Sequence, residues 1–112
     1  MNYSKSLFRT NDGSMSFRVD KLNEAYHSKH GAISESKFVY LKKGFSYWRQ
    51  LNDKRDCKIF EMGYGTGLNA YLSYLESQKL LSKIYYTSLE LFPLTIKEIE
   101  CLNYDQFFTS KN

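Results

Sequence analysis

The chain has 112 residues, enough for at most one domain, and its 42% hydrophobic and 17% aromatic residues exclude a disordered chain. The net charge of +4 is uneven, because residues 1–58 hold twelve basic and six acidic residues whereas residues 59–112 hold four and six. A basic first half suits a polyanionic partner, although an ordinary solvated surface explains scattered charges about as well.

The first part of the chain predicts one short strand. Residues 1–12 are polar and are expected to be loosely held, and residues 11–13 carry a turn signal. Residues 14–20 alternate between apolar and polar side chains, which is typical of a half-buried strand that turns Met15, Phe17 and Val19 to one face. Residues 23–32 are polar and irregular.

A helix is predicted after this irregular segment. Ser34 suits the N-cap position and Glu35 suits the first turn. Gly44 is expected to break or bend the helix. Apolar side chains recur at helical spacing at Phe38, Leu41, Phe45, Trp48 and Leu51.

The second half alternates strands with helices. After a charged loop at residues 52–58, Ile59 opens an apolar strand that ends at a glycine cluster. An amphipathic helix is expected from Leu68 to about Leu81, and Ile84–Leu89 is expected to form a second strand.

Pro93 fits the first turn of a last helix, which is expected to include Leu94, Ile96, Ile99 and Leu102. The order strand, glycine loop, helix, strand, helix is the start of an α/β parallel sheet. We therefore expect the two strands to be adjacent and parallel, with the helix as a right-handed crossover between them.

The glycine cluster reads Glu61-Met-Gly-Tyr-Gly-Thr-Gly-Leu-Asn69. Glycines let the backbone turn sharply and approach a ligand closely, and the free N–H groups at the helix start face that ligand. A dinucleotide fingerprint would need glycine where Leu68 stands, and a P-loop would need Lys and Ser or Thr after Gly67. The pattern Glu-x-Gly-x-Gly-x-Gly instead matches the first motif of class I methyltransferases, and Glu61 suits a cationic ligand.

Glu90 is the second informative acid. It follows the second predicted strand directly, where an acid can accept hydrogen bonds from both hydroxyl groups of a ribose. The order of strand, loop, helix, strand and acid is a stronger signal than three glycines alone.

The sequence then resembles a specific family, the MnmC-type tRNA methyltransferases. Its Gly63-Tyr-Gly-Thr-Gly-Leu-Asn69 is similar to the family's glycine loop, which usually has Phe where Tyr64 stands. Three further stretches agree, and the resemblance runs from Asp12 to about Tyr104. They are Asp12-Gly-Ser14, residues 24–35 with Phe38-Val-Tyr40, and Tyr86-Thr-Ser-Leu-Glu90 with Pro93-Leu94.

The resemblance implies a Rossmann-like class I methyltransferase fold that binds S-adenosylmethionine, with only the first half present. Residues 1–51 would be a short strand and helix that precede the domain, and residues 52–112 the first part of the cofactor-binding domain. Family members methylate the amine of 5-aminomethyl-uridine at the tRNA wobble position, so tRNA is the implied partner. Some members carry a fused flavin oxidase domain, for which this chain has no room, so no oxidoreductase activity is expected.

The expected cofactor contacts come from the glycine cluster, the second acid and the segment that precedes the long helix. Tyr26 and Ser28 are included through the family resemblance, and the catalytic residue is not identified. The predicted residues are Glu61, Gly63, Tyr64, Gly65, Gly67, Leu68, Asn69, Glu90, Tyr26 and Ser28.

The family's domain continues beyond the segment that matches here, with later strands, an adenine-side acid and an acceptor-side segment. Their absence predicts a truncated chain with little or no activity and an exposed sheet edge through which it self-associates. One alternative is a catalytically incompetent remnant or binding module that keeps the cofactor loop. Another is a nucleotide-binding module of a different class, against which Leu68 argues.

No metal site or membrane segment is expected. His27 and His30 have the spacing of a metal pair, but no Cys or acid completes a site at convincing spacing. Cys57 and Cys101 have neither metal-type nor redox-type spacing. Residues 1–10 lack the apolar core of a signal peptide and no apolar run approaches membrane-spanning length, so a cytoplasmic protein is expected.

Overall fold

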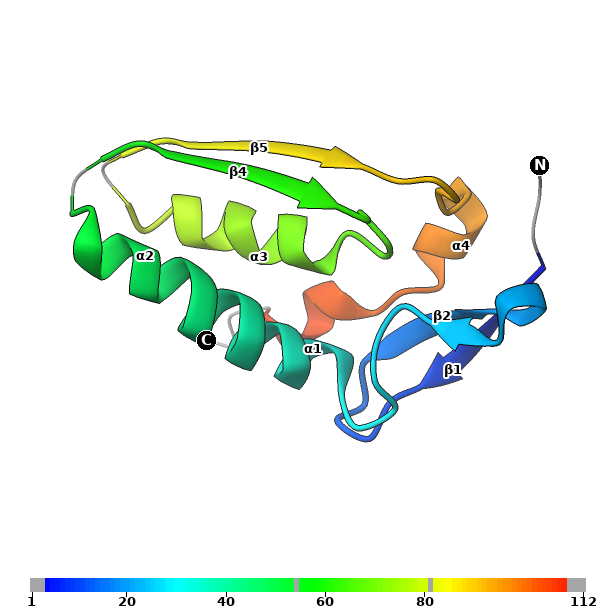
Figure 1. The fold of residues 1–112 in the computed structure, drawn as a ribbon. Coiled ribbons are helices and arrows are strands. Elements are labelled where there is room, and N and C mark those ends of the chain that lie inside the picture. The colour runs from blue at the N-terminus through cyan, green and yellow to red at the C-terminus, as the bar shows by residue number, and fades with distance from the viewer. Residues whose placement is uncertain (1–3, 54, 81, 109–112) are drawn as a thin grey trace.

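The computed structural model describes residues 4–53, 55–80 and 82–108. Its elements form two sheets joined by a long helix (Figure 1). The N-terminal sheet is antiparallel in the order β1-β2-β3, and the second sheet pairs β4 with β5 in parallel. The protein is therefore a mixed α/β structure.

The N-terminal sheet contains two strands more than the single strand that the alternation of residues 14–20 predicts. β2 spans Met15–Val19, as expected, and β3 is the short Glu24–Ala25. The prediction that residues 1–12 are loosely held is wrong for Lys5–Arg9, which form β1 and pair with β2. The backbone groups along one edge of β2 need hydrogen-bond partners, and β1 supplies them. The polar N-terminal residues carry no local pattern that predicts this pairing.

The turn between β1 and β2 lies where the sequence places it. Residues 11–13 form the turn, Gly13 has a φ of 90°, and Thr10 N–H donates to the Ser14 carbonyl at 2.9 Å. After β2, Asp20–Leu22 form the 3-10 helix η1, which ends at Asn23 in the left-handed region with a φ of 53°.

The long helix consists of three consecutive segments. α1 is Ala32–Glu35, η2 is the π-helical Ser36–Phe45, and α2 is Ser46–Leu51. The helix continues through Gly44, which lies within η2, so the predicted break there is wrong, whereas the alternative of a bend stays a prediction. The prediction of Ser34 as N-cap is also wrong, because the cap residue is Gly31.

The helix start is capped by side chains from the β1–β2 turn. Thr10 Oγ1 accepts from the Ala32 N–H at 3.1 Å, and Ser14 Oγ accepts from the Ile33 N–H at 3.2 Å. Asp12 Oδ2 accepts from the Ser34 N–H at 2.8 Å. Capping groups that lie about twenty residues away explain why the local sequence misplaces the cap.

The parallel pair carries the central motif of the fold. β4 spans Cys57–Met62, α3 spans Leu68–Ser77 and β5 spans Ile84–Leu89, with Cys57 opposite Ile84 and Met62 opposite Leu89. The prediction of adjacent parallel strands joined by a helix is confirmed. β4 begins inside the expected loop at residues 52–58, and α3 ends earlier than expected, while its expected end at Leu81 lies outside the described residues.

The last helix begins later than Pro93 predicts. α4 spans Ile96–Glu100, and Thr95 and Glu98 form a reciprocal capping box at its start. Pro93 and Leu94 therefore precede the helix, because Thr95 is the N-cap and its side chain accepts from the Glu98 N–H. Leu102 is also expected in the helix but lies beyond its end at Glu100. η3, a 3-10 helix at Tyr104–Phe107, returns the chain to the core.

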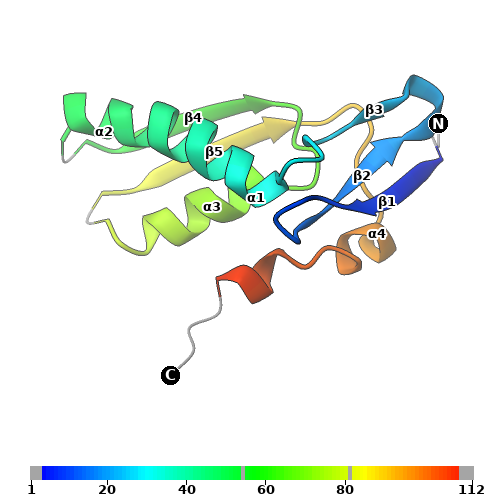
Figure 2. The same cartoon turned by 90° about the horizontal axis from the view of Figure 1, so that it is seen from below.

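The long helix and α3 lie side by side on one face of the β4–β5 sheet (Figures 1 and 2). The main buried cluster lies where both helices meet η3, and it contains Ala32, Ile33, Leu68, Leu72 and Tyr104. No helix in the described part of the chain is long and apolar enough to cross a membrane.

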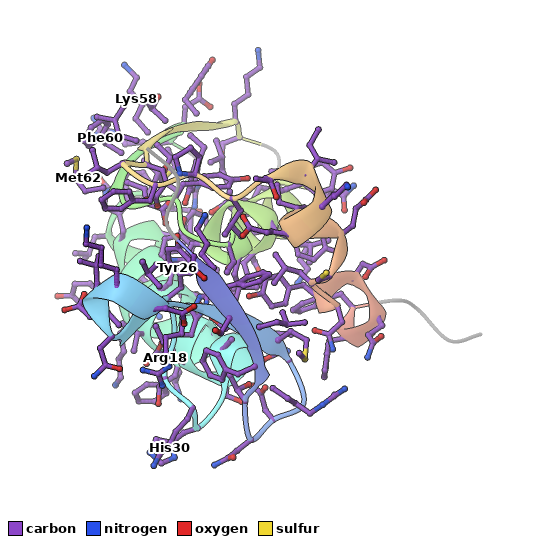
Figure 3. All side chains as sticks on the ribbon, turned by 90° about the vertical axis from the view of Figure 1, so that its right-hand side faces the viewer. Arg18, Tyr26, His30, Lys58, Phe60 and Met62 are labelled. Carbon is purple, nitrogen blue, oxygen red and sulfur yellow. The ribbon has the colours of Figure 1, made fainter. Side chains whose placement is uncertain are left out.

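The opposite face of the β4–β5 sheet has no covering element among the described residues (Figure 1). Phe60 and Met62 of β4 are 62% and 75% exposed there, and Leu89 of β5 is 54% exposed. Figure 3 shows Lys58, Phe60 and Met62 together at the margin of the molecule. We call Lys58, Phe60, Met62, Tyr85, Thr87 and Leu89 the outer face, because strand alternation puts them on one side of the sheet.

Candidate functional site

The glycine loop, residues 63–67, connects the end of β4 to the start of α3. All three of its glycines have positive φ angles, 93° at Gly63, 58° at Gly65 and 81° at Gly67. Gly67 is the N-cap of α3, and the N–H groups of Gly63 and Tyr64 donate to the Leu89 carbonyl at 2.7 and 3.2 Å. The sequence prediction of a strand, a tight glycine turn and a helix is confirmed here.

The three glycines differ in what surrounds them. A Cβ atom at Gly67 would lie 2.7 Å from the Tyr64 ring, and one at Gly65 would lie 3.2 Å from Tyr26 Cδ1. A Cβ atom at Gly63 would meet nothing within 4 Å. The loop is therefore closely packed by two tyrosine rings at one end and open at the other.

A cavity of about 310 Å³ lies between the glycine loop and the segment before the long helix. Seven of the ten predicted site residues line it, namely Tyr26, Glu61, Gly63, Tyr64, Gly65, Leu68 and Asn69. Gly67, Glu90 and Ser28 do not line it. Glu35, Ser36, Val39 and Tyr40 of the long helix form the facing wall, together with His27.

Glu61 is fixed within this cavity by two neighbours. Its Oε1 accepts from Ser88 Oγ of β5 at 2.9 Å, and its Oε2 accepts from Asn69 Nδ2 of α3 at 3.3 Å. Burial raises the pKa of the nearby Tyr86 hydroxyl, and the Glu61 carboxylate raises that pKa further. Glu61 therefore places an acidic side chain at one end of the cavity.

Asn69 contributes a polar atom without a protein partner. Its Oδ1 is buried and accepts no hydrogen bond from the described residues, while its Nδ2 donates to Glu61. A buried acceptor of this kind normally finds a donor, so its orphaned state at the cavity wall indicates room for a ligand donor.

Glu90 lies behind the loop instead of on the cavity wall. Its Oε1 accepts from the Gly65 N–H at 2.6 Å and its Oε2 accepts from the Phe92 N–H at 2.9 Å. Tyr26 closes the group, because its hydroxyl donates to the Phe92 carbonyl at 3.1 Å. Each carboxylate oxygen keeps a second lone pair, so Glu90 can still accept a hydrogen bond from a sugar hydroxyl.

His27 is a cavity residue whose role the sequence left open. Its Nδ1 is 2.9 Å from Oγ of the fully buried Ser16, and its ring meets the Tyr104 ring edge-on with centroids 6.5 Å apart. Burial lowers the pKa of His27, and the Glu35 and Asp12 carboxylates oppose that shift. A neutral imidazole can exchange a proton with a ligand through Nε2.

Ser28 orders the turn next to the cavity. Its Oγ accepts from the His30 N–H at 3.1 Å, and its own N–H lies 3.5 Å from Glu35 Oε1. His30 is exposed at the surface (Figure 3). Within the described ranges, no three His, Cys, Asp or Glu side chains lie close enough together to hold a metal ion.

Two cavity residues escape the sequence patterns. Tyr40 lines the cavity, and its hydroxyl is hydrogen-bonded to Ser73 Oγ of α3. Thr66 lies in the loop, and its Oγ1 accepts from the Tyr104 hydroxyl at 2.9 Å, which ties η3 to the glycine loop. The helical period of residues 38–51 is set by apolar packing residues, so it gives no signal for a polar contact at Tyr40.

None of the family models searched matches the sequence. Among curated proteins, the tRNA 5-methylaminomethyl-2-thiouridine biosynthesis bifunctional protein MnmC of Actinobacillus pleuropneumoniae is 30% identical over 122 residues, covering 97% of this chain. The protein of the same name from Leptospira interrogans is 33% identical over 85 residues, covering 71% of this chain. The chain spans only 17% and 13% of the length of these two relatives.

The fold is similar to a crystal structure described as MNMC2 from Aquifex aeolicus. The TM-score is 0.65 with 24% sequence identity, and the match covers 91% of this chain and 34% of the solved chain. At this identity the likeness shows the fold alone, and it extends over nearly all of the chain described here.

Proposed function

The chain belongs to the MnmC type, and on this premise we propose that it binds S-adenosylmethionine as part of a Rossmann-like tRNA methyltransferase domain. The observation that carries the proposal is the glycine loop between two parallel strands, which opens on the cavity that contains Glu61. In this proposal residues 52–112 belong to the cofactor-binding domain, and residues 1–51 supply the opposite wall of its cleft.

The cavity suits this cofactor in size, charge and free hydrogen-bonding groups. Its volume of about 310 Å³ lies at the lower end of the range for small-molecule pockets. The Glu61 and Glu35 carboxylates suit the ammonium and sulfonium charges, and the orphaned Asn69 Oδ1 offers an acceptor for the ammonium N–H groups. Gly63, with open space beside it, leaves room for close backbone approach.

Every predicted residue except Ser28 has a role in the proposal. Glu61 and Asn69 hold the amino-acid end, the loop backbone at residues 63–67 follows the ligand, and Glu90 accepts from the ribose hydroxyls. Tyr64 and Tyr26 pack against the loop and keep its glycines in position. Leu68 anchors the start of α3 in the core, where it is 1% exposed.

S-adenosylmethionine, when bound, supplies an electrophilic methyl group on a sulfonium sulfur. The protein's part is to align the acceptor amine with that methyl group and to keep the amine neutral. His27 Nε2 has no hydrogen-bond partner among the described residues, so it is the candidate to accept the amine proton. The proposed acceptor is the aminomethyl group of a tRNA wobble uridine, in line with the names of the relatives.

Isothermal calorimetry with S-adenosylmethionine and its demethylated product tests the cofactor proposal. We expect Gly65→Val to abolish binding, since the new side chain would meet Tyr26, and Glu90→Ala to weaken it at least tenfold, or about 1.4 kcal/mol. Glu76→Ala is the matched control, because Glu76 pairs with Lys79 at a distance from the cavity. An unchanged affinity in both test variants, or no binding by the parent chain, would refute the assignment.

A second candidate is cofactor binding without turnover, which the uncovered outer face favours. Unburied Phe60, Met62 and Leu89 indicate that this unit needs a further polypeptide before both substrates are held. We expect little or no transfer of labelled methyl to tRNA bearing the aminomethyl base when the 112-residue chain is assayed alone. Robust turnover without a partner would exclude this second candidate.

A further inference from the structure

The long helix is unusually basic along its exposed side. From Ser36 to Leu51 it exposes Lys37, Lys42 and Lys43, carries the half-buried Arg49 and has no acidic residue, while exposed Glu35 directly precedes this stretch. A merely solvated helix face normally mixes both signs of charge, because opposite charges spaced three or four residues apart stabilise a helix. The one-sided composition points to a negatively charged partner.

Two lysines lie between two exposed aromatic rings on the exposed side of the long helix. The π-helical spacing of η2 brings Lys42 and Lys43 next to Phe38, with their Nζ atoms 5.8 and 5.3 Å from the ring centroid. Phe38 is 54% exposed and Tyr47, further along the helix, is 60% exposed. We call Phe38, Lys42, Lys43 and Tyr47 the basic helix face.

Lys42 and Lys43 form no ion pair with the part of the chain that the structure describes. The ion pairs found among the described residues are Lys5 with Glu98 and Lys79 with Glu76, and neither involves the basic helix face. The positive charge at Lys42 and Lys43 is therefore available to a ligand, apart from its contact with the Phe38 ring.

The basic helix face continues into the cleft of the glycine loop. Val39 and Tyr40, which follow Phe38 directly, line the 310 Å³ cavity opposite Glu61. A ligand that lies along Phe38 and Lys42 can therefore extend one unit into the cavity.

We propose that the basic helix face binds a single-stranded segment of RNA and directs one nucleotide of it into the cleft. Lys42 and Lys43 would contact phosphates, while Phe38 and Tyr47 would stack on unpaired bases. The exposed rings favour a single strand over a duplex, whose bases are already stacked and present only their edges. This inference rests on the proposed function for its RNA substrate and names the surface that would hold it.

Fluorescence anisotropy with a labelled RNA hairpin that has an open, anticodon-like loop tests the proposal. At low salt, Lys42→Glu with Lys43→Glu should weaken binding at least about tenfold and reduce the slope of log affinity against log salt by about two. Phe38→Ala should weaken binding roughly fivefold or more with little change in that slope, since stacking releases no counter-ions.

Lys83→Glu with Lys97→Glu is the charge-matched control, because both residues are exposed and lie outside the basic helix face. It should change the affinity by less than about twofold. An equal loss in this control would overturn the proposal, as would equal binding of an RNA duplex of the same length. Preferential binding of the basic helix face to anionic lipid vesicles would also overturn it.

Cofactor calorimetry on the same variants separates this inference from the proposed function. All of the variants should bind S-adenosylmethionine as the parent does, and circular dichroism should confirm that they fold. A parent that binds RNA through Lys42 and Lys43 but binds no cofactor would refute the proposed function alone. A parent that binds the cofactor but no RNA would refute the basic helix face alone.

Discussion

Two regions of the molecule differ in which side chains they bury. The first is the junction between the N-terminal hairpin and the long helix, and the second is the β4–β5 sheet. At the junction, small polar side chains are buried and paired, since Thr10, Ser14 and Ser16 are at most 2% exposed and each makes hydrogen bonds. In the sheet, large apolar side chains such as Phe60 and Met62 remain in solvent.

Asp12 organises the junction. Its carboxylate accepts from the Ser14 N–H, from the hydroxyls of Thr10 and Ser14, and from the Ser34 N–H at the start of the long helix. Because the charge is surrounded by donors, the turn, the hairpin and the helix start are held by one residue.

The β4–β5 sheet is packed less completely than the junction. Its inner face packs against α3 and the long helix, but an apolar groove of about 540 Å³ remains between the long helix and β4, lined by Val39, Phe45, Trp48 and Ile59 among others. The comparison indicates that the polar groups of the junction are satisfied within this chain, whereas the exposed apolar face of the sheet is suited to contact with a further polypeptide.

Removal of Asp12 should have the largest effect on stability. Asp12→Ala removes the acceptor of the Ser14 and Ser34 N–H groups and of the buried Ser14 hydroxyl, so we expect a loss of about 3 kcal/mol in the free energy of unfolding. Urea denaturation followed by circular dichroism measures it. Asp20→Ala is the control, since the carboxylate of exposed Asp20 accepts from the Ser4 and Ser6 hydroxyls and its loss should cost less than about 1 kcal/mol. Equal losses would contradict the special role of the junction.

The stability that Asp12 gives to the junction should also be lost in acid. Burial alone would raise the pKa of Asp12, but hydrogen bonds from Ser14 and Ser34 outweigh it and hold the pKa well below its ordinary value of 3.8. A depressed carboxyl pKa stabilises the fold above the unfolded value, and this stabilisation is lost as pH falls from about 3.8 towards the folded pKa.

Unfolding curves at several pH values test this dependence. The parent should lose stability below about pH 4 more steeply than Asp12→Asn. Buried His27, whose pKa is lowered from 6.5, should contribute an earlier loss as pH falls below about 6.5, which His27→Gln should remove. Parallel curves for the parent and Asp12→Asn would show that the hydrogen bonds do not favour the ionised carboxylate.

Alanine substitutions in the glycine loop should reduce stability by less than Asp12→Ala, and by different amounts at Gly63 and Gly67. Alanine at either Gly63 or Gly67 must adopt a positive φ, which costs about 1 kcal/mol. Gly67→Ala also forces the Tyr64 ring to move, so it should cost roughly 2 kcal/mol in total, whereas Gly63→Ala should cost only the first part. Thermal unfolding of the two variants compares them directly, and a larger loss at Gly63 would show that the tyrosine contact is unimportant.

Substitution of the outer face should change stability least and association most. Phe60→Glu replaces a side chain that is 62% exposed, so the free energy of unfolding should stay within about 0.5 kcal/mol of the parent. Sedimentation velocity should show that the parent self-associates with rising concentration and that Phe60→Glu with Met62→Glu does not. A monomeric parent at high concentration would mean that the outer face is tolerated in water.

Sequence reasoning succeeded where the structural signal is local. The apolar run Ile84–Leu89, the turn at residues 11–13 and the three glycines after β4 each carry their own backbone preference, so strand, turn and loop lie where the residues predict. The same local signal predicted six of the seven site residues that line the cavity, and the family resemblance supplied the seventh, Tyr26.

Sequence reasoning failed where the hydrogen-bond partner of a segment lies far away in the sequence. β1 forms because β2 needs a partner, and the long helix starts at Ala32 because Thr10, Asp12 and Ser14 cap it. The backbone contacts of Glu90 and the Ser16 contact of His27 likewise join segments that only folding brings together.

The sequence by itself therefore determined the β4–loop–α3–β5 unit, because glycine conformational freedom and apolar periodicity act within a few residues. Only the tertiary structure decided which polar groups face the cavity, since a buried donor or acceptor is satisfied by whichever partner the packed chain brings within 3 Å or so. It also decided that Phe60 and Met62 stay exposed, because strand alternation tells which side they share but not whether anything covers that side.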